Sequence, residues 1–376
     1  MRITLSSSAL SNQLGTLSRV IDNKSATPML ECFLFEVAGG RLTITASDNE
    51  NVMRSSLPLD SSDGEGRFAV NSQKLFNAVK ELPEQPLTLD VDNATSSVKA
   101  IYQNGIYNFA LFNANEYPVP AEFNDDVTTI SVPAGALSDI IARTISAVGV
   151  MEDMRKAMGG INFDLTADAL VMVASDGHKL VRNKYFGVTT ETPSNFILPK
   201  KPAQLLKNAL SKDDEPVEIR FNRRMVAFRF GDVLLQGPLI EGNYPNYNSV
   251  IPTNNPYQLT IDRKAFVGAL RRILPFASES SMLVRLRIES GKLEISSEDI
   301  DYSLSAKEEI ICDYNGNPMN IGFKGSSLIE ILSNLTGENV ILELADPSRP
   351  CIIMPSEQPA DQDVLMLLMP MLLNDY

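Results

Sequence analysis

One pattern of helix and strands occurs three times along the chain, and this repeat limits the fold more than any other feature of the sequence. Each copy begins with an amphipathic helix, in which apolar residues recur at steps of three and four. An alternating hairpin with a Gly or Asp turn then follows. The three predicted helices span residues 7–21, 133–148 and 263–277. The three predicted hairpins span residues 30–45, 160–173 and 284–296.

The second half of each copy repeats as well, because a short strand leads into another helix before further strands. These segments span residues 68–82, 196–210 and 321–335. A period of roughly 120 residues makes the copies whole domains rather than the small units of a solenoid. We therefore predict an α+β fold with three repeated domains, each with two helices packed on antiparallel sheets, at residues 1–122, 128–250 and 257–376. The repeat alone leaves open whether the domains close a ring or sit as beads.

The composition is that of a folded protein, with 44% hydrophobic and 21% charged residues. The longest apolar stretch, residues 364–373, is shorter than a bilayer span and contains Pro370, and the N-terminus lacks a signal-peptide pattern. The cysteines, Cys32, Cys312 and Cys351, lie far apart, and the chain has a single histidine. We therefore expect no disulfide framework, metal site or cofactor, and a cytoplasmic location.

The net charge of −14 weighs against nucleic-acid binding, because phosphate contacts depend on Lys and Arg. The bases, however, concentrate on the predicted helices and their edges. A helix that covers a sheet has one solvent face, so its bases share that face. Ordinary decoration of exposed helices explains the same pattern, and the helix at 326–335 departs from it because it carries no base. The bases concerned are Arg19, Lys24, Lys74, Lys80, Arg143, Arg155, Lys156, Lys200, Lys201, Lys207, Lys212, Arg263, Lys264, Arg271 and Arg272.

Phosphate-loop, dinucleotide and kinase fingerprints are absent from the sequence. The segment Ser175-Asp176-Gly177-His178 contains the residue types of a nucleophilic triad. Adjacent residues of an extended segment point to opposite faces, so they do not form the ordered relay by themselves. A polar turn is the favoured interpretation. A hydrolase centred on Ser175 and His178 is one alternative function, and a monomeric repeat scaffold that binds only proteins is another.

Several segments together form a specific pattern, and they are residues 174–180, residues 244–247 with 250–252, residues 369–371, residues 24–30 and residues 321–323. In these segments the chain resembles the beta subunit of bacterial DNA polymerase III, the DNA sliding clamp. The resemblance covers essentially the full chain, and the segments are specific only in combination. It implies a non-enzymatic, head-to-tail dimer, a six-domain ring that encircles duplex DNA without sequence preference and tethers the polymerase. A separate ATP-driven loader would open the ring.

The resemblance also implies residue roles. The DNA-facing residues would be Arg19, Lys24, Lys80, Arg143, Arg155, Lys156, Lys200, Lys201, Lys207, Arg271 and Arg272. The dimer contact would use Lys74, Ala78, Leu82, Tyr107 and Phe109 of one subunit and Ile273, Pro275 and Phe276 of the other. A pocket for peptides of the replicative polymerase, the clamp loader and other clamp-binding proteins would be lined by Met158, Ser175, Gly177, His178, Lys179, Leu180, Pro245, Ser249, Val250, Ser348, Pro350, Leu367, Met369, Pro370 and Met371. A methionine-rich groove can repack around different peptides.

The chain departs from the family pattern at several positions. Many relatives have a basic residue at the position of Ser249 and an Arg-Leu pair where this chain has Leu372-Leu373. Residues 374–376 extend beyond the usual terminus, and Lys156 and Ala157 replace two aromatic residues of the DNA-touching loop. The departures imply a more apolar pocket with a different preferred peptide, and a DNA contact that depends more on charge.

Overall fold

The computed structural model describes residues 1–22, 27–118, 123, 126–149 and 156–373. The chain divides into two compact units, of which the first comprises Met1–Ser138 with Gln204–Leu239 and the second Asp139–Ala203 with Ile240–Tyr376. Helices α3 (Ala134–Thr144) and α4 (Lys200–Ala209) contribute residues to both units. The division therefore passes through the middle repeat rather than between repeats.

The described part of the first unit is built on one 13-stranded antiparallel sheet in the order β10-β15-β16-β17-β4-β3-β2-β6-β9-β8-β7-β1-β5. Its strands are β1 (Arg2–Ser6), β2 (Cys32–Ala38), β3 (Arg41–Ser47), β4 (Val52–Pro58), β5 (Ser61–Ser62), β6 (Gly66–Asn71), β7 (Pro86–Asp92), β8 (Ser97–Tyr102), β9 (Gly105–Phe112), β10 (Thr128–Pro133), β15 (Pro216–Phe221), β16 (Met225–Phe230) and β17 (Val233–Pro238).

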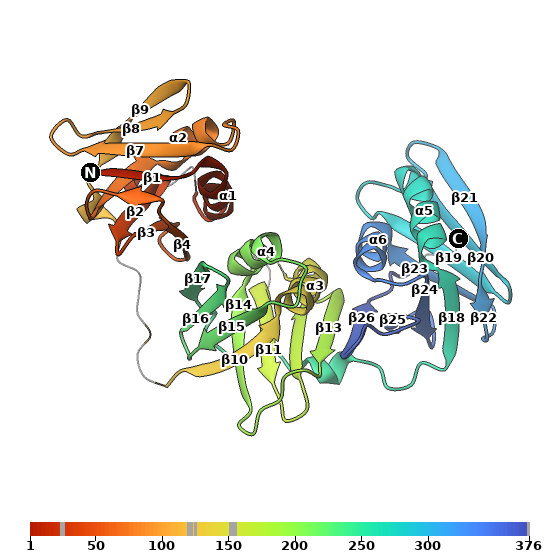
Figure 1. Cartoon of the computed structure of the whole chain (residues 1–376). Helices are drawn as coiled ribbons and strands as arrows, with labels where there is room; N and C mark the ends of the chain where they lie inside the picture. Colours follow the sequence, from red (N-terminus) through yellow and green to blue (C-terminus); the bar gives the residue numbers. More distant parts are fainter. Residues whose placement is uncertain (23–26, 119–122, 124–125, 150–155, 374–376) are drawn as a thin grey trace. The chain divides into compact units, whose positions relative to one another are not determined.

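Helices α1 (Ser7–Leu17) and α2 (Ser72–Val79) of this unit lie side by side (Figure 1). The Ser6 hydroxyl caps α1 by accepting the amide of Ala9 at 3.1 Å. The apolar stripe of α1 faces the core. Gly15 permits the close approach of the two helices, because a Cβ there would meet the Phe76 ring at 3.3 Å.

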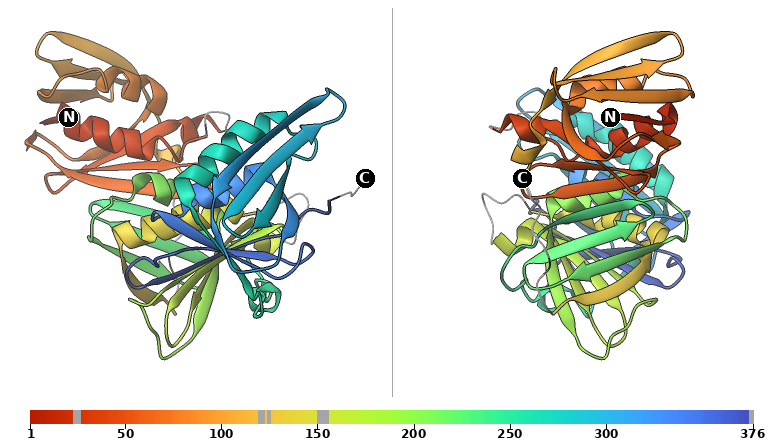
Figure 2. Two further views of the ribbon diagram at one scale, coloured as in Figure 1. Left: turned by 90° about the vertical axis from the view of Figure 1, so that its right-hand side faces the viewer. Right: turned by 60° about the vertical axis from the view of Figure 1, so that its left-hand side comes forward.

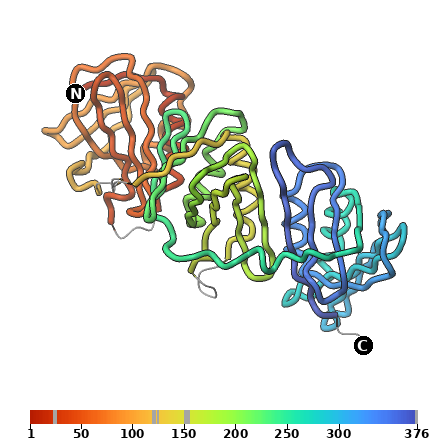
Figure 3. The backbone as a smooth tube through the Cα atoms, turned by 90° about the horizontal axis from the view of Figure 1, so that it is seen from below, coloured from red at the N-terminus to blue at the C-terminus, as the bar shows by residue number. Residues whose placement is uncertain are grey.

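The second unit holds two antiparallel sheets in its described residues, with orders β14-β11-β12-β13-β26-β25-β24-β18-β22 and β21-β20-β19-β23. In the nine-stranded sheet, the strands β24, β25 and β26 run side by side (Figure 3, blue). The strands are β11 (Gly160–Leu165), β12 (Leu170–Ser175), β13 (Lys179–Tyr185), β14 (Ser194–Pro199), β18 (Tyr257–Asp262), β19 (Leu283–Glu289), β20 (Lys292–Asp299), β21 (Leu304–Ile311), β22 (Asp313–Tyr314), β23 (Met319–Lys324), β24 (Asn339–Leu344), β25 (Cys351–Pro355) and β26 (Gln362–Leu368).

Helices α5 (Arg263–Ile273) and α6 (Gly325–Asn334) pair in the third repeat, and α5 packs along β20 and β21 (Figure 2). The Asp262 carboxylate caps α5 by accepting the amide of Ala265 at 2.6 Å. The observed helices agree with the predicted segments but end earlier. Helix α1 ends at Leu17, and the last turn predicted for α5 is the 3-10 helix Leu274–Phe276.

Sheets continue from one repeat into the next. Strand β17 of the second repeat pairs with β4 of the first, with Val233 opposite Ser55. Strand β13 of the second repeat pairs with β26 of the third along its whole length, from Lys179–Leu368 to Tyr185–Gln362. Within the chain, sheets therefore run across both boundaries between repeats.

Candidate functional site

A pocket of about 460 Å³ lies in the second unit, where the second and third repeats meet. This volume is in the usual range for sites that bind small ligands or short peptide segments. The lining residues come from β12, β13 and the turn between them, from the segment before β18, and from β26 and the residue after it, with Met158 from the 3-10 helix before β11 and Pro350 from just before β25. They are Met158, Ser175, Gly177, His178, Lys179, Leu180, Tyr244, Pro245, Asn246, Tyr247, Val250, Pro350, Leu367 and Met369.

The floor of the pocket is apolar and firmly packed. Leu180 and Leu367 belong to one buried cluster with Val173, and Tyr244 and Tyr247 pack against it. The rim is more open, because Met369 is 37% exposed and Val250 is 54% exposed. The arrangement offers a preformed floor and a flexible apolar edge to a ligand.

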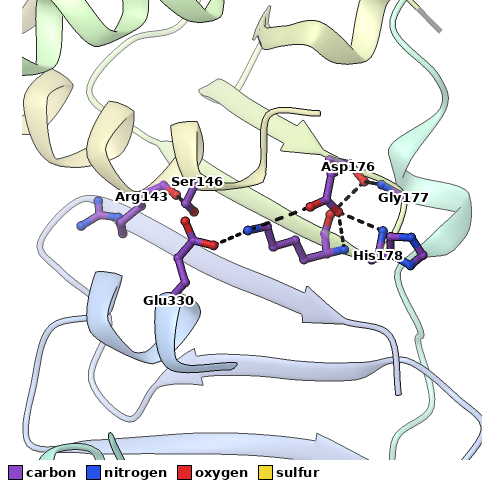
Figure 4. Close-up of polar contacts among 8 residues, drawn as sticks. Arg143, Ser146, Asp176, Gly177, His178 and Glu330 are labelled. Carbon is purple, nitrogen blue, oxygen red and sulfur yellow. Dashed lines mark hydrogen bonds and ion pairs between the residues drawn. The ribbon is translucent and has the colours of Figure 1, made fainter. Parts of the chain in front are cut away.

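The turn between β12 and β13 carries the polar wall. The Asp176 carboxylate accepts the amides of His178 at 2.9 Å and Lys179 at 2.8 Å (Figure 4). Gly177 has φ +85°, a left-handed conformation that favours glycine. The Ser175 hydroxyl donates to the Lys179 carbonyl at 2.9 Å instead of pairing with the imidazole. The structure therefore shows a polar turn at residues 175–179, as the sequence predicted, and no Ser175–His178 pair.

Two tyrosines are held in place beside the pocket, Tyr244 by the polar wall and Tyr247 by β11, and the prediction of the lining omitted them. The Tyr244 hydroxyl accepts the Ser175 amide at 2.9 Å, and burial raises the pKa of Tyr244 to about 12. The Tyr247 hydroxyl donates to the Asp164 carboxylate at 3.1 Å, and burial, followed by the nearby Asp164 charge, raises the pKa of Tyr247 to about 12. Both phenols therefore stay neutral near neutral pH. Asn246 was omitted too, although the 244–247 segment was a clear signal.

Most of the predicted lining residues lie together around the pocket, and four do not. The Ser249 hydroxyl donates to the Asn246 carbonyl at 2.7 Å. Ser348 is held in a turn, where its amide donates to Asp346 at 2.9 Å. The amide of Met371 donates to the Gly322 carbonyl at 2.8 Å, which turns the chain toward β23. The predicted residues outside the lining are Ser249, Ser348, Pro370 and Met371.

The DNA-facing prediction is wrong for Arg143, which is only 4% exposed. Its Nε donates to the Asn183 side chain at 2.9 Å, and its Nη2 donates to the Gln362 side chain. Burial lowers the pKa of this guanidinium below its ordinary value. Arg143 therefore joins α3 to β13 and β26 in the interior, and it has no solvent face from which to reach a phosphate.

The other predicted bases that the structure describes are exposed. Arg19, at the end of α1, donates to the Asn208 carbonyl at 3.1 Å, and the Arg272 Nε donates to the Glu308 carboxylate at 2.9 Å. Lys24 and Arg155 lie outside the described residues. The exposed predicted bases are Arg19, Lys80, Lys156, Lys200, Lys201, Lys207, Arg271 and Arg272.

The predicted dimer contacts lie on and just after α2 and on β9 in the first repeat, and on α5 and the 3-10 helix that follows it in the third. On β9, residues Gly105–Ala110 pair only with β8 among the described strands, and the Tyr107 ring contacts the Tyr102 ring with centroids 5.0 Å apart and the planes tilted by 34°. Lys74 is exposed, Ala78 and Leu82 are half-buried, and Phe109 lies on the same edge strand as Tyr107. In the third repeat, Pro275 and Phe276 are exposed. Ile273 is 3% exposed on the buried stripe of α5, so its predicted role as a contact residue is wrong.

The described residues contain no cluster of His, Cys, Asp or Glu that could hold a metal ion. Among the same residues, no helix is long and apolar enough to span a membrane. All three cysteines are buried free thiols. Burial, followed by the Glu31 charge, raises the pKa of Cys32 to about 11.

Comparison with known proteins gives matches over nearly the whole chain. Residues 1–121, 131–246 and 248–372 match the N-terminal, central and C-terminal domains of the DNA polymerase III beta subunit. The beta sliding clamp of Caulobacter vibrioides is 25% identical over 392 aligned residues, covering 99% of this chain and 100% of the relative. That of Pseudomonas putida is 26% identical over 374 aligned residues, with the same coverage of both chains.

Solved structures agree with the sequence matches. The sliding clamp of Pseudomonas aeruginosa bound to griselimycin shares the fold, with a TM-score of 0.92, 24% identity, and coverage of 99% of this chain and 100% of that one. The sliding clamp of Bartonella birtlesii bound to griselimycin has a TM-score of 0.88 and 26% identity at the same coverage. The chain therefore belongs to the DNA polymerase III beta subunit family, whose members are the sliding clamps that tether a polymerase to DNA.

Proposed function

We propose that this clamp is a head-to-tail dimer, that duplex DNA passes through the ring, and that the pocket around Leu180 and Met369 binds short peptide segments of the proteins it tethers. The observation that carries the proposal is the pocket itself, with its packed apolar floor, methionine edge and braced polar wall. The peptides would belong to the replicative polymerase, the clamp loader and other clamp-binding proteins. We keep the predicted domains, residues 1–122, 128–250 and 257–376, and a cytoplasmic location as parts of this proposal.

Two sheet edges support the dimer. The edge of β9 in the first repeat carries Ile106, which is 56% exposed, beside the Tyr102–Tyr107 ring pair. Strand β21 of the third repeat pairs only with β20 among the described strands and exposes Leu304 at 43% and Ile311 at 88%. Long unpaired edges with apolar side chains favour pairing with another chain. Because the two edges differ, the contact is heterologous, and it closes into a ring only if the rotations sum to a full turn.

The exposed helix bases support a DNA contact despite the net charge of −14. Lys200, Lys201 and Lys207 all lie on α4, and Arg271 and Arg272 lie in the last turn of α5. Lysine and arginine contacts to phosphates are independent of sequence and weaken as salt rises. Weak contacts suit a protein that must slide, because closure of the ring prevents escape.

We propose that the chain performs no catalysis. Tethering changes rebinding of the polymerase from a bimolecular step to an intramolecular one at high effective concentration. The bond from the Ser175 hydroxyl to the Lys179 carbonyl argues against a hydrolase at this turn. Ester hydrolysis by purified protein that is lost on His178→Ala would overturn this part of the proposal.

The ring is tested by loading the protein on a nicked circular plasmid and separating bound from free protein by gel filtration. We expect the protein to remain with the circle and to leave after one restriction cut, because a ring slides off an end. The control is Phe276→Asp, a change at an exposed position of the proposed dimer contact that should prevent the ring from closing. Equal retention on circular and linear DNA would contradict encirclement, and a protein that stays monomeric would support the scaffold alternative.

A further inference from the structure

Lys179 belongs both to the pocket wall and to the junction with helix α6. Its amide donates to the Asp176 carboxylate at 2.8 Å, and its carbonyl accepts the Ser175 hydroxyl at 2.9 Å. Its side chain is only 8% exposed, and its ammonium binds the Glu330 carboxylate, with Asp176 Oδ2 at 3.9 Å. Figure 4 shows Glu330 on its helix facing the turn that carries Asp176, Gly177 and His178.

This ion pair joins two repeats at the pocket. Lys179 begins β13 of the second repeat and stands opposite Leu368 of β26, next to Met369 of the pocket rim. Glu330 lies on α6 of the third repeat, and its side chain is 44% exposed. The His178 carbonyl also accepts the Met369 amide at 2.8 Å. The turn is thus tied to the third repeat by a backbone hydrogen bond at His178 and by a charge pair at the adjacent Lys179.

A buried ammonium is stable only with a partner, so the position of Glu330 determines where the Lys179 side chain lies. Without Glu330, the ammonium keeps, among the carboxylates that the structure describes, only the 3.9 Å contact with Asp176, whose carboxylate already accepts two turn amides. Reorientation of Lys179 toward solvent would strain the hydrogen bonds from the His178 and Lys179 amides to the Asp176 carboxylate. It would also displace Gly177 and His178, which line the pocket.

We propose that the Lys179–Glu330 pair is a positioning device that holds the 175–180 turn against α6 and thereby keeps the pocket in its peptide-binding form. This inference rests on the proposed peptide-binding function. Breaking the pair lowers the fraction of molecules with a competent pocket, and the apparent Kd rises in inverse proportion to that fraction. Lys179 and Glu330 therefore affect peptide affinity without Glu330 touching the peptide.

The test measures the Kd of a fluorescein-labelled nonapeptide that carries adjacent Leu and Phe side chains, by fluorescence anisotropy with the full-length protein. We expect Glu330→Gln to raise the Kd about tenfold, which corresponds to a competent fraction of about one tenth. Lys179→Met should weaken binding as well, and the double variant should be no weaker than Glu330→Gln, because both changes break one interaction.

Hydrogen exchange of the His178 and Lys179 amides gives a second readout. Both amides bind Asp176, so their exchange should accelerate in Glu330→Gln without peptide, while the thermal unfolding midpoint changes little. Asp232→Asn is the matched control, because it breaks the 3.1 Å Arg41–Asp232 pair between the first and second repeats. It should leave the peptide Kd unchanged.

The outcomes separate this inference from the proposed function. If wild-type protein does not bind the peptide, the peptide-binding function fails. If wild-type protein binds and Glu330→Gln stays within about twofold of it, only the positioning role is overturned. Single-variant effects that multiply in the double variant would also overturn it, because the two side chains would then act independently.

Discussion

Met369 and Leu180 both line the pocket, but their replacement by alanine should have different consequences. Met369 is 37% exposed in the free protein, whereas Leu180 is 2% exposed. A ligand can therefore bury more of Met369, while Leu180 is already buried against Val173 and Leu367. Met369→Ala should act mainly on binding, and Leu180→Ala should act mainly on folding.

The magnitudes follow from these exposures. Full burial of a methionine side chain stabilises by about 1.5–3 kcal/mol, and about a third of that remains for the ligand to gain. Met369→Ala should therefore lose about 0.5–1 kcal/mol of binding, a two- to fivefold rise in Kd. Leu180→Ala leaves a cavity in a packed cluster and should lower the free energy of unfolding by about 2–5 kcal/mol.

Peptide anisotropy titrations and urea unfolding of both variants check this separation. Met369→Ala should keep the urea midpoint of the wild type, and Leu180→Ala should unfold at clearly lower urea. The separation of a binding role for Met369 from a packing role for Leu180 is refuted if Met369→Ala binds the peptide with unchanged affinity. It is refuted equally if Leu180→Ala is as stable as the wild type, because the burial of Leu180 would then carry no packing energy.

Three further predictions concern DNA, assembly and pH. Lys207→Gln should reduce the slope of log K against log salt for duplex binding by about 0.9. Substitution of the buried Arg143 by Met should leave that slope unchanged. Equal slopes in both variants would contradict the assignment of Lys207, and not Arg143, to the DNA contact. Phe276→Asp should give monomers in sedimentation, and an intact dimer would exclude that residue from the contact. Burial raises the pKa of Tyr244 from 10.0 to about 12 and of Cys32 from 9.0 to about 11, so the folded state retains protons that the unfolded chain releases. The free energy of unfolding should thus fall between about pH 9 and about pH 12, and a urea midpoint that rises over this range would contradict it.

The threefold pattern predicted the elements well, because helical and alternating periodicities reflect one buried face and do not need tertiary information. The pocket floor was also predictable through the resemblance, since Leu180 stands in the recognisable segment 174–180 and Leu367 lies two residues before the segment 369–371. What sequence reasoning missed depends on contacts between distant segments. Tyr244 lies 69 residues from Ser175, whose amide its hydroxyl accepts.

Arg143 shows the limit of assigning helix bases by type. Its position in the last turn of α3 is that of an exposed base, but β26 supplies Gln362 from far along the chain, and Asn183 of β13 provides a second acceptor. A guanidinium with such acceptors can be buried, whereas a lysine without them is usually exposed. No periodicity within residues 133–148 reports those partners.

The strand pairs that join neighbouring repeats affect how pieces of the protein would behave when expressed alone. A fragment that contains only the first repeat would leave the Val52–Ser55 backbone of β4 without its β17 partner. A fragment of the second repeat would expose both β17 and the seven-residue β13. Bare edges of this kind recruit other strands, so isolated repeats should aggregate or form non-native oligomers where the intact chain stays dispersed.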